Sequence, residues 1–182
     1  MDSKIILRNT FHIENASSED GNLTINGYCA HYDTPNLNSE IVNADSFNYF
    51  FSLYNDKKLK PALNFNHTDT IIGGIDSIES KEDGLWMQAH LNGNVAICRD
   101  MIIPCILNGD LDSFSTEGYI YGNTDGIVFN DDDTYYVKDF LLTAVAIVPT
   151  PADANAKFTI RNYLNTIPKP EPKYVSPTII LL

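Results

Sequence analysis

The sequence is poor in basic residues, in cysteine and in long apolar runs, and each shortage excludes a class of protein. Twelve Lys and Arg residues stand against twenty-four Asp and Glu residues in a chain of 182, so the formal net charge is −12. Such a surface repels phosphate, which argues against a nucleic-acid partner. The three cysteines form no Cys-x-x-Cys pair, so we expect neither a disulfide scaffold nor a zinc ribbon.

The apolar runs are too short for a membrane span or a signal peptide. Near the N-terminus only Ile5, Ile6 and Leu7 are consecutive apolar residues. The apolar core of a signal peptide needs about 7–15 residues and a membrane helix about 20. We therefore expect a cytosolic protein with reduced thiols and no membrane association.

What the sequence does contain is enough apolar material for a folded core. Hydrophobic residues make up 43% and charged residues 20% of the chain, which is typical of a globular domain. The length predicts about one domain, which we assign to residues 1–163. Residues 164–182 contain four prolines and are predicted to form a Pro-rich C-terminal tail.

Strand-type segments dominate this domain, because β-branched and aromatic residues recur between turn residues. We predict strands over residues 4–13, 22–32, 62–66, 71–79, 84–91, 111–121, 127–129 and 135–148. The sequence Lys81-Glu82-Asp83-Gly84 predicts an antiparallel hairpin in which Gly84 adopts a positive φ. The run Asn130-Asp131-Asp132-Asp133 predicts a solvated turn, because it lacks the ligand spacing of an EF-hand calcium loop.

Two segments have helical spacing, so the predicted class is mainly β with a few helices (α+β). The first begins at Asp45 or Ser46 and ends near Asn55, with four aromatic residues on one face. The second covers residues 94–107, and Gly109 is placed to end it. Because Pro104 has no backbone N–H, we expect a kink there or a helix end near Ile103.

His67 is the histidine best placed for chemistry. It follows the predicted strand 62–66 and precedes the predicted strand 71–79, so a rigid strand end would present its imidazole. His12, His31 and His90 lie within strand-type segments or at the end of one, and we interpret them as surface or packing residues.

Ser113 and Ser115 are the serine candidates, and both lie in the predicted strand 111–121. Strand alternation places Ser113, Ser115 and Glu117 on one face. A serine hydroxyl needs a neighbouring base before it becomes a nucleophile. The sequence contains no Gly-x-Ser-x-Gly elbow, Ser-x-x-Lys pair, His-Glu-x-x-His motif, P-loop or dinucleotide fingerprint.

The order of several segments resembles the tailed-phage prohead (capsid maturation) serine proteases, whose fold is shared with herpesvirus assemblin. The resemblance covers roughly residues 27–161. The segments that carry it are Gly27-Tyr28-Cys29-Ala30, residues 47–53, Leu63-Asn64-Phe65-Asn66-His67 with Ile72-Gly73, Gly84-Leu85-Trp86-Met87, residues 108–115 and Ala146-Ile147-Val148-Pro149-Thr150-Pro151-Ala152-Asp153. It implies a closed or partly open antiparallel β-barrel of the assemblin type.

Carried over position by position, the resemblance implies that Ser115 is the nucleophile and His67 the general base. The third catalytic position of the family falls on Ala144, which cannot orient an imidazole. Three interpretations remain open: another carboxylate serves, with Glu117 favoured over Asp69; the enzyme works as a dyad; or the protein is inactive. A cysteine protease that pairs Cys29 or Cys98 with His67 is disfavoured, because cysteines are commonly buried.

The resemblance implies a serine endopeptidase that cleaves scaffold and major capsid precursor proteins during phage head maturation. It would act in the host bacterial cytoplasm, inside the assembling prohead, without a cofactor or a metal. The resemblance also allows a homodimer. The competing interpretation, favoured by Ala144, is an inactive protease-like protein that serves as a head-assembly or scaffold-binding factor.

Overall fold

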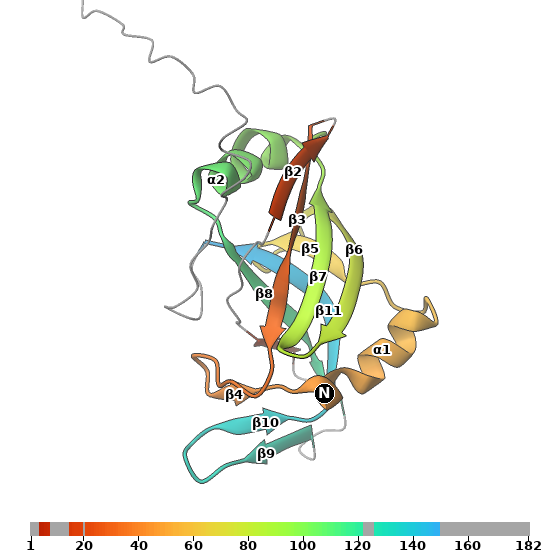
Figure 1. The fold of residues 1–182 in the computed structure, drawn as a ribbon, viewed down its shortest axis with the longest axis vertical. Helices are drawn as coiled ribbons and strands as arrows, with labels where there is room; N and C mark the ends of the chain where they lie inside the picture. The colour runs from red at the N-terminus through yellow and green to blue at the C-terminus, as the bar shows by residue number, and fades with distance from the viewer. Residues whose placement is uncertain (1–3, 8–14, 20, 122–125, 150–182) are drawn as a thin grey trace, which may run out of the picture.

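The computed structural model describes residues 4–7, 15–19, 21–121 and 126–149, which form one large sheet, one small sheet and two helical segments (Figure 1). The strands are β1 (Lys4–Leu7), β2 (Asn15–Glu19), β3 (Asn22–His31), β4 (Glu40–Ile41), β5 (Ala62–Phe65), β6 (Ile71–Lys81), β7 (Gly84–Leu91), β8 (Ser113–Ile120), β9 (Ile127–Phe129), β10 (Tyr135–Val137) and β11 (Phe140–Val148). The helical segments are η1 (Ala44–Phe47) with α1 (Asn48–Asn55), and η2 (Cys98–Ile102) with α2 (Ile103–Asn108).

The large sheet is strongly curled and has the strand order β1-β8-β11-β5-β6-β7-β3-β2 (Figure 1). The small sheet has the order β4-β10-β9. The prediction of a mainly β fold with a few helices is confirmed. A closed barrel is not seen, because β1 and β2 remain the two edges of the large sheet among the described strands.

The sheet is also mixed, so the prediction of an antiparallel barrel is wrong in this respect. β5 runs parallel to β11, and β4 runs parallel to β10. The predicted strand 135–148 is two strands, β10 in the small sheet and β11 in the large one. Alternation within a strand shows which side chains share a face, but it does not show which strand lies alongside.

The core packs against one face of the large sheet. In β3 the burial alternates regularly along the strand, as expected when one face is packed and the other is not. The largest fully buried side chains are Phe47, Phe50, Phe114, Phe140, Leu23, Ile25, Leu63, Ile72 and Leu85. Burying a side chain of this size stabilises a fold by roughly 1.5–3 kcal/mol.

The first helical segment begins slightly earlier than the sequence predicts. Its N-cap is Asn43, whose Oδ1 accepts the Ser46 N–H at 3.1 Å, while Ser46 Oγ accepts the Asn43 N–H at 2.9 Å. These reciprocal bonds form a capping box, which satisfies two backbone donors that would otherwise lack partners. Phe47 and Phe50 are fully buried, which confirms the predicted apolar face.

The second helical segment does not end near Ile103. A π-helical turn over Cys98–Ile102 leads into α2, which begins at Ile103 and places Pro104 in its first turn. The π turn is continuous with α2, and its wider bonding, in which the Ile103 N–H donates to the Cys98 carbonyl, accommodates a following residue that has no N–H. Gly109 ends the helix with φ 83°, as predicted.

The predicted hairpin is confirmed, but the reason given for its glycine is wrong. β6 and β7 pair antiparallel, with Lys81 opposite Gly84. The glycines with a positive φ in the described part of the chain are Gly21 and Gly109. At Gly84 a Cβ would lie 2.1 Å from the Ala30 carbonyl oxygen, so glycine is required for the close approach of β3.

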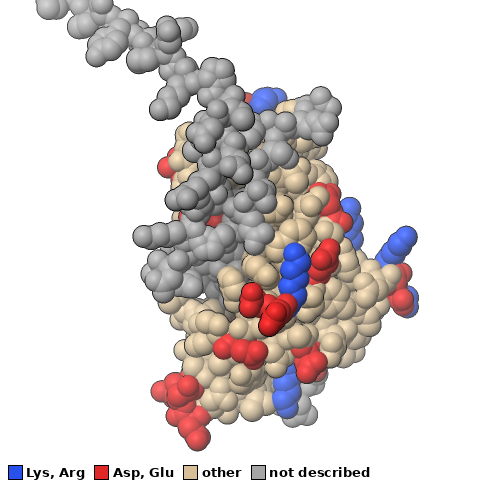
Figure 2. Space-filling view, viewed as in Figure 1, with Lys and Arg blue, Asp and Glu red and all other residues tan. Residues whose placement is uncertain are grey.

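The run Asn130–Asp133 is a solvated turn, as predicted. Asp131, Asp132 and Asp133 are exposed, and Asp132 Oδ1 accepts the Thr134 N–H at 3.1 Å. Acidic side chains gather at the end of the molecule where Figure 1 places the β9–β10 hairpin (Figure 2). The predicted domain end at residue 163 and the predicted tail 164–182 lie outside the described residues. None of the described helices is long and apolar enough to cross a membrane.

Candidate active site

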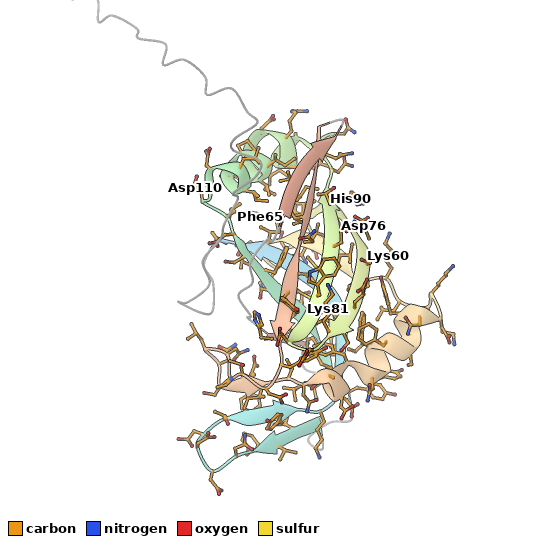
Figure 3. The ribbon with its side chains drawn as sticks, viewed as in Figure 1. Lys60, Phe65, Asp76, Lys81, His90 and Asp110 are labelled. Carbon is orange, nitrogen blue, oxygen red and sulfur yellow. The ribbon has the colours of Figure 1, made fainter. Side chains whose placement is uncertain are left out.

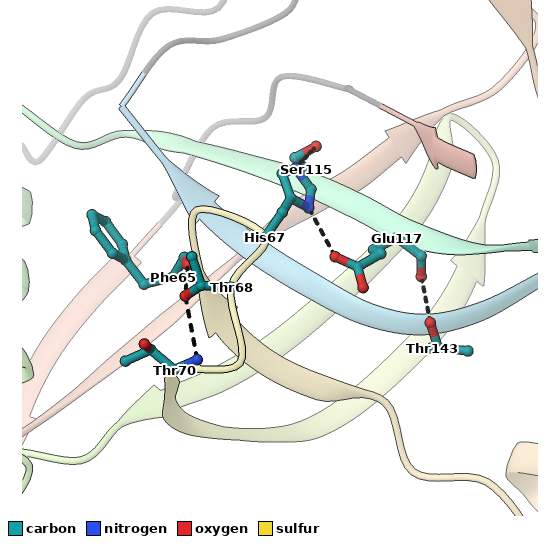
Figure 4. A network of polar contacts seen from close by, with 7 residues as sticks. All are labelled: Phe65, His67, Thr68, Thr70, Ser115, Glu117 and Thr143. Atoms are coloured by element: carbon teal, nitrogen blue, oxygen red, sulfur yellow. Dashed lines mark hydrogen bonds and ion pairs between the residues drawn. The ribbon is translucent and has the colours of Figure 1, made fainter. Parts of the chain in front are cut away.

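A tight turn between β5 and β6 carries His67. Asn66 and His67 both have a positive φ, 51° and 57°, and the Thr68 N–H donates to the Phe65 carbonyl at 3.1 Å. These features define a type I′ turn, a conformation that Asn and His adopt more readily than most residues. Thr68 Oγ1 also donates to the Phe65 carbonyl at 2.7 Å (Figure 4). The turn is therefore held rigid by its own hydrogen bonds.

The turn directs the imidazole across a neighbouring strand. In the sheet β5 lies next to β11, and β11 lies next to β8. The Asn66 N–H donates to the Ile147 carbonyl of β11 at 2.9 Å, which ties the turn to that strand. Figure 4 shows His67 reaching from this turn over β11 to β8.

On β8 the imidazole meets two side chains, one at each ring nitrogen. His67 Nε2 lies 2.9 Å from Ser115 Oγ, and His67 Nδ1 lies 3.1 Å from Glu117 Oε2. Ser115 and Glu117 project from the same face of the strand, about 6.8 Å apart along it. The structure therefore brings together the three residues that the sequence nominated.

The chemistry of these groups fixes the direction of both hydrogen bonds. An ionised carboxylate can only accept, so Nδ1 of His67 carries the proton and donates it to Glu117. Nε2 of the neutral ring then has a free lone pair and accepts the Ser115 hydroxyl proton. The His67 and Glu117 side chains are only 11% and 8% exposed, so little water weakens their interaction.

The strand between His67 and β8 carries alanine at the two positions that the imidazole crosses. Ala146 is directly opposite Ser115, and Ala144 is directly opposite Glu117. Directly opposed residues project from the same face, so these alanines lie on the face that carries the site. Two methyl groups leave room for a ring above them. The pattern Ala144-x-Ala146 is the feature of the sequence that indicates where the imidazole crosses β11. It can be interpreted only once the strand order is known.

The acid that contacts His67 comes from β8, not from Ala144 on β11. It occupies the position directly opposite Ala144. The Glu117 main-chain carbonyl accepts a hydrogen bond from Thr143 Oγ1 at 3.2 Å, where the β8–β11 pairing shifts its register (Figure 4). Of the two carboxylates that the sequence suggested, Glu117 contacts the imidazole, whereas Asp69 is exposed.

The other serine candidate has a different partner. Ser113 is fully buried, and its Oγ donates to Asp112 Oδ1 at 2.6 Å. Ser115 is the serine that contacts His67.

The remaining histidines and cysteines lie elsewhere. His90 forms an exposed pair with Asp76, with Nδ1 at 2.7 Å from Oδ1 (Figure 3). His31 stacks on Tyr28, and His12 lies outside the described residues. Burial raises the pKa of the Cys29 and Cys98 thiols, which disfavours the nucleophilic thiolate. Within the described ranges no three His, Cys, Asp or Glu residues are grouped to hold a metal ion.

The serine is shielded in this structure. Ser115 is 1% exposed, and Glu117 is 6% exposed. In this conformation a peptide has no access to Ser115 Oγ.

Comparison with known proteins agrees with this arrangement. A family model of the caudovirus prohead serine proteases matches residues 10–169. The chain belongs to this family. Prohead serine proteases act in phage capsid maturation, so the resemblance seen in the sequence is confirmed at the level of the family.

The fold is also similar to that of a solved protein. The structure of the bacteriophage T4 capsid assembly protease gp21 aligns with a TM-score of 0.61 and 16% identity, covering 82% of this chain and 98% of that one. At this identity the likeness establishes the prohead-protease fold, while the roles of individual residues rest on the geometry above. A search of curated proteins found no match.

Proposed function

We propose that this prohead-protease family member is an active serine endopeptidase with Ser115, His67 and Glu117 as its catalytic triad. The observation that carries the proposal is the imidazole itself. One ring nitrogen lies 2.9 Å from a serine hydroxyl, and the other lies 3.1 Å from a carboxylate. The base is thus within hydrogen-bond reach of both the nucleophile and the orienting acid, as general-base catalysis requires.

In the proposed reaction Ser115 Oγ attacks the scissile carbonyl carbon while His67 Nε2 takes the hydroxyl proton. Glu117 holds the ring in the required tautomer and stabilises the imidazolium that forms. When the tetrahedral intermediate collapses, Nε2 donates its proton to the leaving amine and Ser115 remains acylated. A water molecule, deprotonated by His67, then hydrolyses the ester and restores the serine.

We infer that the substrates are the scaffold and major capsid precursor proteins of the same phage. Family membership supports this inference, since prohead proteases act on the immature head. Cleavage would take place inside the assembling prohead in the host cell. A homodimer, or removal of the C-terminal tail, would serve as the switch that opens the shielded serine.

Co-expression with the scaffold and capsid precursors of the phage tests this function. We expect shortened products with the wild-type enzyme and none with Ser115→Ala or His67→Ala. Ser113→Ala is the matched control, because Ser113 lies on the same strand but bonds to Asp112. Intact precursors with the wild type would instead support a role in head assembly without catalysis, and equal cleavage by Ser115→Ala would show that Ser115 is not the nucleophile.

A further inference from the structure

One buried polar atom near the site has no hydrogen-bond partner. Asn64 is 5% exposed, and its Oδ1 accepts no hydrogen bond. In the described part of the chain only Asn26 has a comparable atom. An unpaired buried amide oxygen destabilises a fold, and most buried polar atoms are paired, so Asn64 requires a reason.

The strand register places Asn64 in one row with the proposed nucleophile. Asn64 on β5 is opposite Ala146 on β11, and Ala146 is opposite Ser115 on β8. Residues in such a row project from one face, so Asn64 lies on the face that carries Ser115. The preceding residue, Leu63, packs in the core with Val145, as alternation requires. Two strand spacings separate Asn64 from Ser115, about 9.6 Å.

The position of His67 shows which part of a substrate would approach Asn64. His67 must protonate the leaving nitrogen, so that nitrogen has to lie close to Nε2. The imidazole reaches Ser115 from the β5 side, where Asn64 lies. The chain that follows the scissile bond therefore extends toward β5. The first nitrogen of that chain is the one held at Nε2, and each further residue advances about 3.4 Å toward β5, so the N–H of the second residue is the first that the Asn64 side chain can meet.

We propose that Asn64 binds the backbone of the leaving-group segment of a peptide substrate, with Oδ1 accepting the N–H of the second residue after the scissile bond. The inference rests on the proposed function. Asn64 Oδ1 has no existing partner to lose, so a peptide N–H adds a hydrogen bond without breaking one. Asn64 and Ser115 are shielded on the same face, so the opening that exposes the serine also exposes the amide.

Acyl transfer tests this binding without knowledge of the natural substrate. p-Nitrophenyl acetate acetylates Ser115 and releases p-nitrophenol. Added amines then compete with water for the acetyl group: the amine nitrogen bonds to the acetyl carbon, the bond to Ser115 Oγ breaks, and the amine proton passes through His67 to Oγ. The probes are glycyl-glycinamide, which carries the N–H of a second residue, and propylamine, which supplies only the attacking amine nitrogen. The measurement is the ratio of the two acetylated products.

We expect the wild-type enzyme to favour glycyl-glycinamide over propylamine, and Asn64→Leu to reduce that preference about tenfold, the loss of one hydrogen bond of about 1.4 kcal/mol. Asn64→Asp retains an acceptor and should retain the preference. Asn26→Leu is the matched control, because it removes the other unpaired oxygen from β3, three strands from β5. Its preference should equal that of the wild type.

A second measurement does not depend on the folding of any variant. Glycyl-sarcosinamide lacks the N–H of the second residue, whereas glycyl-N,N-dimethylglycinamide keeps it; if the wild type captures these two amines equally well, the N–H of the second residue is not bound and the inference is overturned. An equal preference in wild type and Asn64→Leu also overturns it, while acetylation of Ser115 would leave the proposed function intact. If p-nitrophenol release is the same in Ser115→Ala as in the wild type, no acyl-enzyme forms at Ser115 and both proposals fail.

Discussion

At the scale of single residues, the account depends on a carboxylate that the sequence offered only as one of several candidates. Glu117 is 8% exposed at its side chain and lies 3.1 Å from His67 Nδ1. Alternation along the strand predicted that Ser115 and Glu117 share a face, and that prediction is confirmed by their common contact with His67. Their catalytic roles remain a proposal, and substitution of the acid is the way to test it.

Replacing Glu117 with glutamine keeps the shape of the side chain and removes its charge. A glutamine amide can also favour the wrong tautomer of His67, which in a serine protease lowered the rate by about 10⁴-fold. We expect kcat/KM for cleavage to fall by about 10²–10⁴-fold in Glu117→Gln, with the folded structure retained by circular dichroism. Asp69→Asn is the matched control, because Asp69 is a nearby exposed acid. Loss of activity in Asp69→Asn rather than Glu117→Gln would assign the role to Asp69.

From the burial of the Cys29 thiol we predict how the stability of the protein changes at high pH. Burial raises the pKa of this thiol in the folded protein, while the unfolded chain has an ordinary value of about 8.5. Above that pH the unfolded state loses the proton and the folded state keeps it, so the free energy of unfolding falls as pH rises. One such group contributes a slope of up to about 1.4 kcal/mol per pH unit.

Denaturant unfolding between neutral and alkaline pH measures this slope. We expect Cys29→Ala to be less stable than the wild type near neutral pH, because a buried side chain is shortened, and to lose stability less steeply above the thiol pKa. If the free energies of unfolding of the two proteins fall equally with pH, the pH dependence does not come from the Cys29 thiol.

At the scale of strands, the site exists because three neighbours in the sheet come from distant parts of the sequence. β5 supplies the turn, β8 supplies the serine and the acid, and β11 lies between them with two alanines. Sequence patterns located His67 at a strand end and ordered the side chains of β8. They could not show that β5 and β11 run parallel, because strand partners are chosen by long-range packing.

The pairing of Glu117 with Ala144 predicts that the carboxylate can be moved across the strands. Directly opposed Cα atoms lie about 4.5–5.5 Å apart, so an acid at either position projects toward the same imidazole. We expect Glu117→Ala with Ala144→Asp to recover at least about tenfold of the activity lost in Glu117→Ala alone, a change of about 1.4 kcal/mol in the barrier.

The control for this transfer is Glu117→Ala with Ala146→Asp, since Ala146 is opposite Ser115 instead. We expect no recovery in that variant. Equal recovery from both positions, or recovery from neither, would show that the register does not determine where the acid must be.

At the scale of the whole molecule, the core that the structure describes lies before the predicted tail. Every large, fully buried side chain in the described residues lies between Leu23 and Ile147. Helical spacing predicted the buried aromatic face that includes Phe47 and Phe50. The predicted positive φ of Gly84 is wrong, because the requirement for glycine there arises from the approach of β3 and so depends on three-dimensional packing.

Removal of residues 164–182 tests the predicted domain boundary. If these residues contribute no core, the shortened chain should unfold within about 2 °C of the full chain, less than the shift that about 1 kcal/mol causes in a domain of this size. Thermal unfolding followed by circular dichroism measures this difference. A decrease of 10 °C or more would place part of the core beyond residue 163.

The account as a whole requires that His67 activates Ser115. The most direct measurement is the rate at which a fluorophosphonate probe labels the protein, with the modified residue identified by mass spectrometry. The account predicts an adduct on Ser115 in the wild type, no adduct in Ser115→Ala, and labelling at least about 100-fold slower in His67→Ala, the lower end of the contribution of a general base. Labelling of another residue, or an undiminished rate in His67→Ala, would contradict it.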